Sequence, residues 1–98
     1  MDERLSELKI SVQKAFDWIL NEAPDTGSAR DIARIILWLY NCRAYPNDRA
    51  FDACDYERAQ WCIDLIEYFL TTRQEPQQWF PNGQELMGRI KERYGRNE

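Results

Sequence analysis

Residues 25–41 read DTGSARDIARIILWLYN and combine a turn, a helix start and a helix with apolar side chains on nearly every side. The run from Ile35 to Tyr40 is apolar without interruption. A helix with one face in water carries polar residues on that face, so a helix of this kind has to be surrounded by others. The stretch therefore predicts a central apolar helix, over about residues 28–43, inside a small helical bundle.

Three further segments, at about residues 2–21, 55–72 and 82–94, repeat apolar residues at the three- and four-residue spacing of amphipathic helices. The apolar face expected in the second of these is made of Ala59, Cys62, Ile63, Ile66, Phe69 and Leu70. No segment alternates apolar and polar residues as a half-buried strand does. The predicted fold class is all-α, a compact four-helix bundle-like single domain over residues 1–98.

Polar residues at the ends of these segments predict where the helices begin. The expected N-terminal caps are Ser28 with Asp31, Asp55 alone, and Asn82 with Glu85. Pro24 and Gly27 separate the first two helices, because proline lacks an amide donor and glycine permits a positive φ. One short helical turn is expected in the connection at residues 75–83.

The composition limits the classes of function. A net charge of −4 argues against nonspecific nucleic-acid binding, which depends on basic contacts to phosphates. The connection before the third helix is also too long for a helix-turn-helix reader. The N-terminus is charged, and no apolar run approaches the roughly 20 residues that span a bilayer. We therefore expect a cytoplasmic protein without membrane contact or direct nucleic-acid binding.

Catalytic and metal-binding patterns find little support. The chain has no histidine, which removes the commonest general base and the commonest metal ligand. Its three cysteines have no metal-site spacing. Asp25-Thr26-Gly27 matches the aspartic-protease triplet, but that chemistry needs a β-framework, and a turn explains the residues here. The acids of residues 48–57 lack the ligand pattern of a calcium loop. We expect no enzyme, no cofactor and no metal.

Acidic and aromatic residues are the candidates for binding a partner. Acids outnumber basic residues between positions 48 and 67. Trp79-Phe80 lies between two prolines, and such aromatic residues either complete a small core or contact a partner. Both interpretations of that loop, core plug and binding handle, stay open. The candidate partner-binding residues are Asp48, Asp52, Asp55, Glu57, Asp64, Trp61, Trp79 and Phe80.

The central stretch also resembles a known group of proteins. The residues that carry the resemblance are Asp25-Thr26-Gly27, Ala29, Arg30, Ala33, Ile36, Leu37, Trp38 and Asn41. They resemble a family of short helical proteins from bacteria and their mobile elements, with a DTG-x-S/A-R turn and an apolar helix ending near Trp and Asn. The match covers about residues 15–70. The family's function is unknown, so the resemblance implies a helical accessory protein of bacterial origin and no particular activity.

Two functions remain after these exclusions. The first is a non-catalytic protein-binding module, in concrete form an anti-CRISPR-like inhibitor from a phage or plasmid. Its acidic helical surface would block a larger, nucleic-acid-binding defence complex, because acids can occupy a basic groove. The alternative is a self-associating, homodimeric structural or regulatory domain with Trp18, Trp61 or Trp79 at a two-fold interface.

Overall fold

Helices make up most of the chain in the computed structural model, which describes residues 2–45 and 55–95. The four α-helices are α1 (Asp2–Asp17), α2 (Gly27–Tyr40), α3 (Tyr56–Thr72) and α4 (Gly83–Tyr94). A π-helical turn, η1 (Trp18–Glu22), continues α1, and a 3-10 turn, η2 (Pro76–Gln78), precedes α4. The described residues contain no strand, which confirms the predicted all-α fold and the short turn before the last helix.

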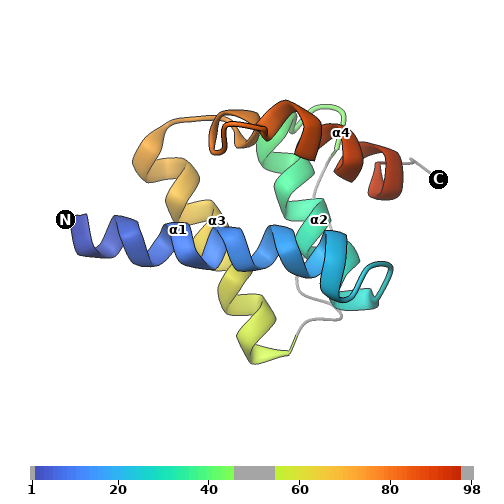
Figure 1. The fold of residues 1–98 in the computed structure, drawn as a ribbon, viewed down its shortest axis with the longest axis horizontal. Coiled ribbons are helices and arrows are strands. Elements are labelled where there is room, and N and C mark those ends of the chain that lie inside the picture. The colour runs from blue at the N-terminus through green and yellow to red at the C-terminus, as the bar shows by residue number, and fades with distance from the viewer. Residues whose placement is uncertain (1, 46–54, 96–98) are drawn as a thin grey trace.

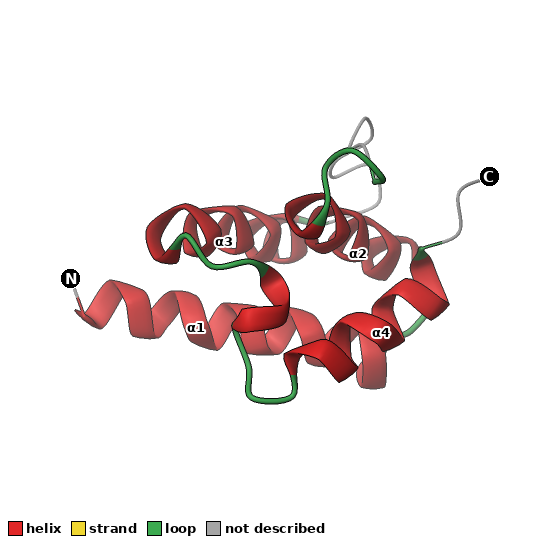
Figure 2. Cartoon of the chain, turned by 90° about the horizontal axis from the view of Figure 1, so that it is seen from above, coloured by secondary structure: helices red, strands yellow, loops and turns green. Residues whose placement is uncertain are grey.

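The helices pack around one shared hydrophobic core. In Figure 1, α1 runs along the long direction of the molecule and α3 crosses it. Figure 2 shows α2 and α3 together on one side of α1, with α4 near the end of α2. Contacts join α1 to α3, and they join α2 to α3, α4, η1 and η2. The elements around α2 are therefore the two neighbouring helices and the two short turns.

Helix α2 is central, as predicted, but its burial is uneven. Ile35, Ile36 and Leu37 are all buried. Three consecutive helical residues point over an arc of about 200°, so α2 is covered on most of its circumference at this level. The rest of the apolar run, residues 38–40, is only half-buried. The helix also ends at Tyr40 rather than near residue 43, because the Asn41 side chain accepts the next free amides, those of Arg43 and Ala44.

The first helix ends in a wider turn than the sequence predicted. The Ala23 amide donates to the Trp18 carbonyl at 2.8 Å, five residues back, which is the π-helical pattern. That bond leaves the Ile19 carbonyl without its usual α-helical donor, and Pro24 has no amide hydrogen to offer instead. The Tyr94 hydroxyl donates to the Ile19 carbonyl at 2.6 Å. A side chain from α4 thus satisfies the backbone group that the π turn leaves open.

One of the three predicted helix caps is wrong, and a second is at the predicted residue but lacks its side-chain hydrogen bond. Asp55 accepts from the Arg58 amide at 2.9 Å and caps α3 as predicted. Helix α2 is capped by Thr26, whose hydroxyl accepts from the Ala29 amide, so α2 begins before Ser28. The expected partner of Ser28 in that cap, Asp31, is instead buried and contacts Arg34 at 3.0 Å. The Asn82 side chain makes no capping hydrogen bond.

In the turn between η1 and α2, the residue with a left-handed backbone conformation is Asp25, whereas the sequence predicted Gly27. Asp25 has a φ of 69°, whereas Gly27 lies in the first turn of α2 and has no positive φ. Aspartate tolerates this conformation better than most residues because its short polar side chain bonds locally. The Asp25 amide donates to the Tyr94 hydroxyl at 3.1 Å, so the same hydroxyl holds both η1 and this turn.

Candidate protein-binding surface

The Trp79 side chain plugs the core, which resolves the two interpretations of its loop. The indole ring is 4% exposed and packs edge-on against Phe16 and Tyr68, with ring centroids 6.2 and 5.2 Å apart. Its Nε1 donates to the Gln74 carbonyl at 2.9 Å, so the polar edge of the ring is satisfied inside the protein. Phe80 is half-buried and lies 5.0 Å from Phe16, centroid to centroid. A ring placed in this way completes the core and offers little area to a partner.

Trp61 belongs to a stack at the junction of η1 and α3. Its ring packs edge-on against Trp18 with centroids 5.9 Å apart. The Arg58 guanidinium carbon lies 3.9 Å from the Trp18 ring centroid and 4.7 Å from that of Trp61. Arg58 is also paired with Glu57, Nη1 to Oε1, at 2.8 Å. The intramolecular arginine thus occupies the face that these two tryptophans would otherwise present.

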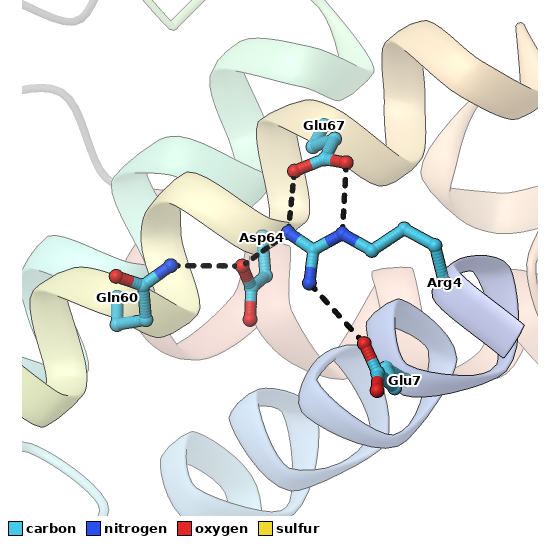
Figure 3. A network of polar contacts seen from close by, with 5 residues as sticks. All are labelled: Arg4, Glu7, Gln60, Asp64 and Glu67. Carbon is cyan, nitrogen blue, oxygen red and sulfur yellow. Dashed lines mark hydrogen bonds and ion pairs between the residues drawn. The ribbon is translucent and has the colours of Figure 1, made fainter.

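Asp64 lies inside a polar network that joins α1 to α3 (Figure 3). Asp64 is 6% exposed, and its Oδ1 accepts from Gln60 Nε2 at 3.1 Å and lies 3.8 Å from Arg4 Nη2. The Arg4 guanidinium is bound by both oxygens of Glu67, at 2.7 and 3.1 Å, and its Nη1 lies 3.5 Å from Glu7. The Asp64 carboxylate therefore stabilises the contact between two helices and is turned away from solvent.

The same network shifts the pKa values of Glu67 and Arg4 in opposite directions. The hydrogen bonds from Arg4 hold the pKa of Glu67 below its ordinary value of 4.5. The reciprocal hydrogen bond from Glu67 raises the pKa of Arg4. At the end of α1 a second pair behaves differently, because Glu22 shares a hydrogen bond with Asp17, which raises the pKa of Glu22. Residues 17 and 22 are five positions apart, the interval that the π turn brings onto one side of the helix.

The other acidic residues predicted to bind a partner do not form one continuous surface among the residues that the structure describes. Asp55 and Glu57 are exposed at the N-terminal end of α3, where the first caps the helix and the second contacts Arg58. Asp48 and Asp52 lie outside the described residues. The acids that the structure describes are thus divided between a helix cap, an ion pair and an interhelical network.

The outer face of α3 carries a row of exposed apolar residues that the sequence prediction placed incorrectly. Ile63 and Leu70 were expected to face the core, but they are 48% and 52% exposed, and Tyr56 is 85% exposed. Cys62 is buried as predicted, but the other fully buried residues of α3 are Asp64, Leu65 and Tyr68, which the predicted face did not include. We call Tyr56, Ile63 and Leu70 the α3 stripe. Their spacing of seven residues shows that the three side chains share one side of the helix, but not that this side is exposed.

Two hollows lie on the surface around Leu20 of η1. One, of about 390 Å³, is lined by Leu20, Arg89, Glu92 and Arg93. The other, of about 280 Å³, is lined by Gln13, Phe16, Asp17, Leu20, Asn21, Phe80 and Leu86. Both arginines of the first hollow contact protein groups, since Arg89 lies 3.5 Å from the Asn21 side chain and Arg93 lies 3.9 Å from Asp25. The first hollow carries charges of both signs, and the second carries one acid, Asp17.

The structure also places the cysteines and bears on the questions of metal ligands and membrane-spanning helices. Cys62 is buried in α3 and Cys42 is exposed just after α2, while Cys54 lies outside the described residues. Within residues 2–45 and 55–95, no three acidic or cysteine side chains converge as metal ligands would. None of the helices described is both long and apolar enough to cross a membrane.

No family model, curated protein or solved structure matches this chain.

Proposed function

We propose that this chain is a non-catalytic protein-binding domain and that the α3 stripe is its binding surface. One observation carries the proposal: three large apolar side chains, Tyr56, Ile63 and Leu70, are exposed in a row along a single helix. Single exposed apolar residues are common on soluble proteins, but an aligned row is typical of an interaction site. A partner that covers the row removes its apolar area from water, which supplies the main driving force for association.

The contacts around the stripe support the same proposal. The neighbouring helix positions Ala59 and Ile66 are half-buried and continue the apolar surface on one side. On the other side Glu67 is held by Arg4, so its charge is partly neutralised next to the stripe. An apolar centre with a polar rim is the usual anatomy of a protein–protein interface.

A photoreactive amino acid placed at Ile63 tests this proposal in the cells that naturally produce the protein. We expect a crosslinked adduct from position 63, and a second variant carrying the same group at Leu70 should give the same adduct. The matched control is position 10, because Ile10 is equally exposed, at 52%, but belongs to α1. Equal labelling at positions 10 and 63, or no adduct from either stripe position, contradicts the proposal.

The inhibitor form of this function rests on charge. An acidic protein that blocks a basic groove gains affinity and speed from electrostatic steering, and the net charge of −4 with Asp55 and Glu57 exposed beside the stripe supports it. The test is to exchange Asp48, Asp52, Asp55 and Glu57 for their amides, which keeps the α3 cap because asparagine caps as well as aspartate does. Unchanged affinity for the crosslinked partner in this variant excludes the groove-blocking form.

A further inference from the structure

We infer that the α3 stripe binds a second copy of this chain, with the two α3 helices packed antiparallel about a two-fold axis. The inference rests on the proposed function, since it names the partner of the same surface. Its first support is the spacing of the stripe. Residues seven apart drift by only about 20° around a helix, so the three side chains form one seam along α3. This repeat is what lets two helices stay in contact over several turns.

The stripe is also complementary to itself. Ile63 lies midway between Tyr56 and Leu70, seven residues from each. A two-fold axis beside Ile63 therefore sets Ile63 against the partner's Ile63 and sets Tyr56 against the partner's Leu70. Two-fold pairs require such a surface, in which the same patch serves both copies. The seam has one large apolar side chain at each of these levels in both copies.

The flanking residues fit the antiparallel arrangement by size. Ala59 and Ile66 lie on the same side of the stripe, four residues before and three residues after Ile63. In the antiparallel pair the small Ala59 side chain lies within one residue, about 1.5 Å along the axis, of the level of the partner's Ile66, and the reverse holds on the other copy. Small residues opposite large ones allow facing helices to interdigitate.

Charge at the helix ends selects the antiparallel direction over the parallel one. Asp55 and Glu57 are exposed at the N-terminal end of α3, and Arg73 is exposed directly after its C-terminal end. Antiparallel packing brings the Arg73 end of one helix beside the acidic end of the other, and it also pairs opposite ends of the helix dipoles. Parallel packing would set acids beside acids, which opposes association.

Sedimentation equilibrium of the full chain, from about 10 µM to about 1 mM, tests the pairing. Because the contact is one helix wide, we expect a weak dimer with a dissociation constant of about 10–100 µM. Ile63→Glu places two like charges on the two-fold axis and should raise this constant roughly tenfold or more, and Leu70→Glu should also weaken the dimer. Ile10→Glu, at a similarly exposed apolar residue of α1, should leave it unchanged. Circular dichroism verifies that each variant is folded.

A disulfide experiment tests the direction. In a chain with Cys42→Ser and Cys54→Ser, Tyr56→Cys and Leu70→Cys variants are mixed and oxidised, and the bridged peptides are identified by mass spectrometry. Antiparallel pairing predicts a bridge between positions 56 and 70 of different copies. Bridges of 56 to 56 and 70 to 70 would show the parallel pair and overturn the antiparallel assignment.

The outcomes separate this inference from the proposed function. A wild-type chain that remains monomeric at about 1 mM overturns the second copy as partner. If the photoreactive group at Ile63 then forms an adduct with a different protein, the binding surface stands and only its occupant was wrong. If it forms no adduct above the Ile10 control, the proposed function fails as well. An adduct of twice the mass of the chain supports both.

Discussion

At the residue scale, Tyr94 joins three elements through one hydroxyl. It donates to the Ile19 carbonyl of η1 and accepts from the Asp25 amide before α2, while its own backbone belongs to α4. Both bonds go to backbone groups that no neighbouring residue satisfies in this turn. A buried or half-buried backbone carbonyl without a donor costs more than the bond itself contributes.

We expect Tyr94→Phe to lower the free energy of unfolding by about 1–2 kcal/mol, because it removes both hydrogen bonds and leaves the Ile19 carbonyl without a donor. Urea denaturation followed by circular dichroism measures the loss. Tyr56→Phe is the matched control, since the Tyr56 ring is 85% exposed and should cost nothing measurable. Equal stability of the two variants would contradict the role assigned to the Tyr94 hydroxyl.

Trp79 is a large buried side chain that the connection between α3 and α4 contributes to the core. Trp79→Ala removes a buried ring and its edge-on contacts with Phe16 and Tyr68, so we expect a loss of about 3–5 kcal/mol. Trp79→Phe should lose less, because it keeps a ring in the core. Ile10→Ala, at an exposed position, should stay within about 0.5 kcal/mol of wild type. A small effect of Trp79→Ala in the same urea titration would mean that the ring does not support the core.

At the element scale, the approach of η2 to α4 depends on one glycine. A Cβ atom at Gly83 would lie 1.9 Å from the backbone oxygen of Gln77, where no side chain can move aside. Gly88, also in α4, has nothing within 4 Å of the same position. Gly83 is therefore required by the close contact with η2, whereas Gly88 can be replaced by a residue with a side chain.

We expect Gly83→Ala to destabilise the protein by about 1–3 kcal/mol through forced movement of the η2 backbone. Gly88→Ala should instead stabilise it by about 0.5–1 kcal/mol, since alanine loses less conformational entropy in a helix. Thermal melts of both variants beside wild type decide the matter. A shift of the same sign for both would refute the close approach at Gly83.

At the scale of the whole molecule, the Arg4 network ties the beginning of the chain to α3 and makes stability depend on pH. The pKa of Glu67 is lower in the folded protein than its ordinary value of 4.5. Its stabilising contribution is therefore fully present above that value and is lost as the pH falls through the folded pKa. The raised pKa of Glu22 acts in the opposite direction, because its contribution is present at low pH and is lost as the pH rises.

We therefore expect the melting temperature of wild type to fall more steeply on acidification than that of Glu67→Gln, which cannot titrate. The two melting temperatures should diverge below about pH 4.5. Wild type and Glu92→Gln, an exposed control on α4, should show the same pH dependence. Thermal melts at a series of pH values measure both slopes. Parallel curves for wild type and Glu67→Gln would show that the ion pair contributes nothing to folding.

The sequence by itself determined the class of the fold and the approximate position of the four α-helices that the structure describes. Periodicity is local, so apolar spacing within one segment is enough to show a helix, and the run from Ile35 to Tyr40 predicted a buried α2, which holds for Ile35 to Leu37. The Asp55 cap was predictable for the same reason, because a cap and the amide that it binds are three residues apart. These features depend on residues within one or two helical turns of each other.

Only the tertiary structure decided which apolar residues remain exposed. Helix α3 has apolar side chains on more than one side, and its spacing cannot show which side the other helices cover. Ile63 and Leu70 therefore looked like core residues although they face solvent. The same holds for Trp79, for Arg4 with Glu67 and for Tyr94 with Ile19, since each pair of groups meets only after distant segments have packed. Long-range packing selects among faces that local patterning leaves equivalent, and here it leaves the α3 stripe uncovered.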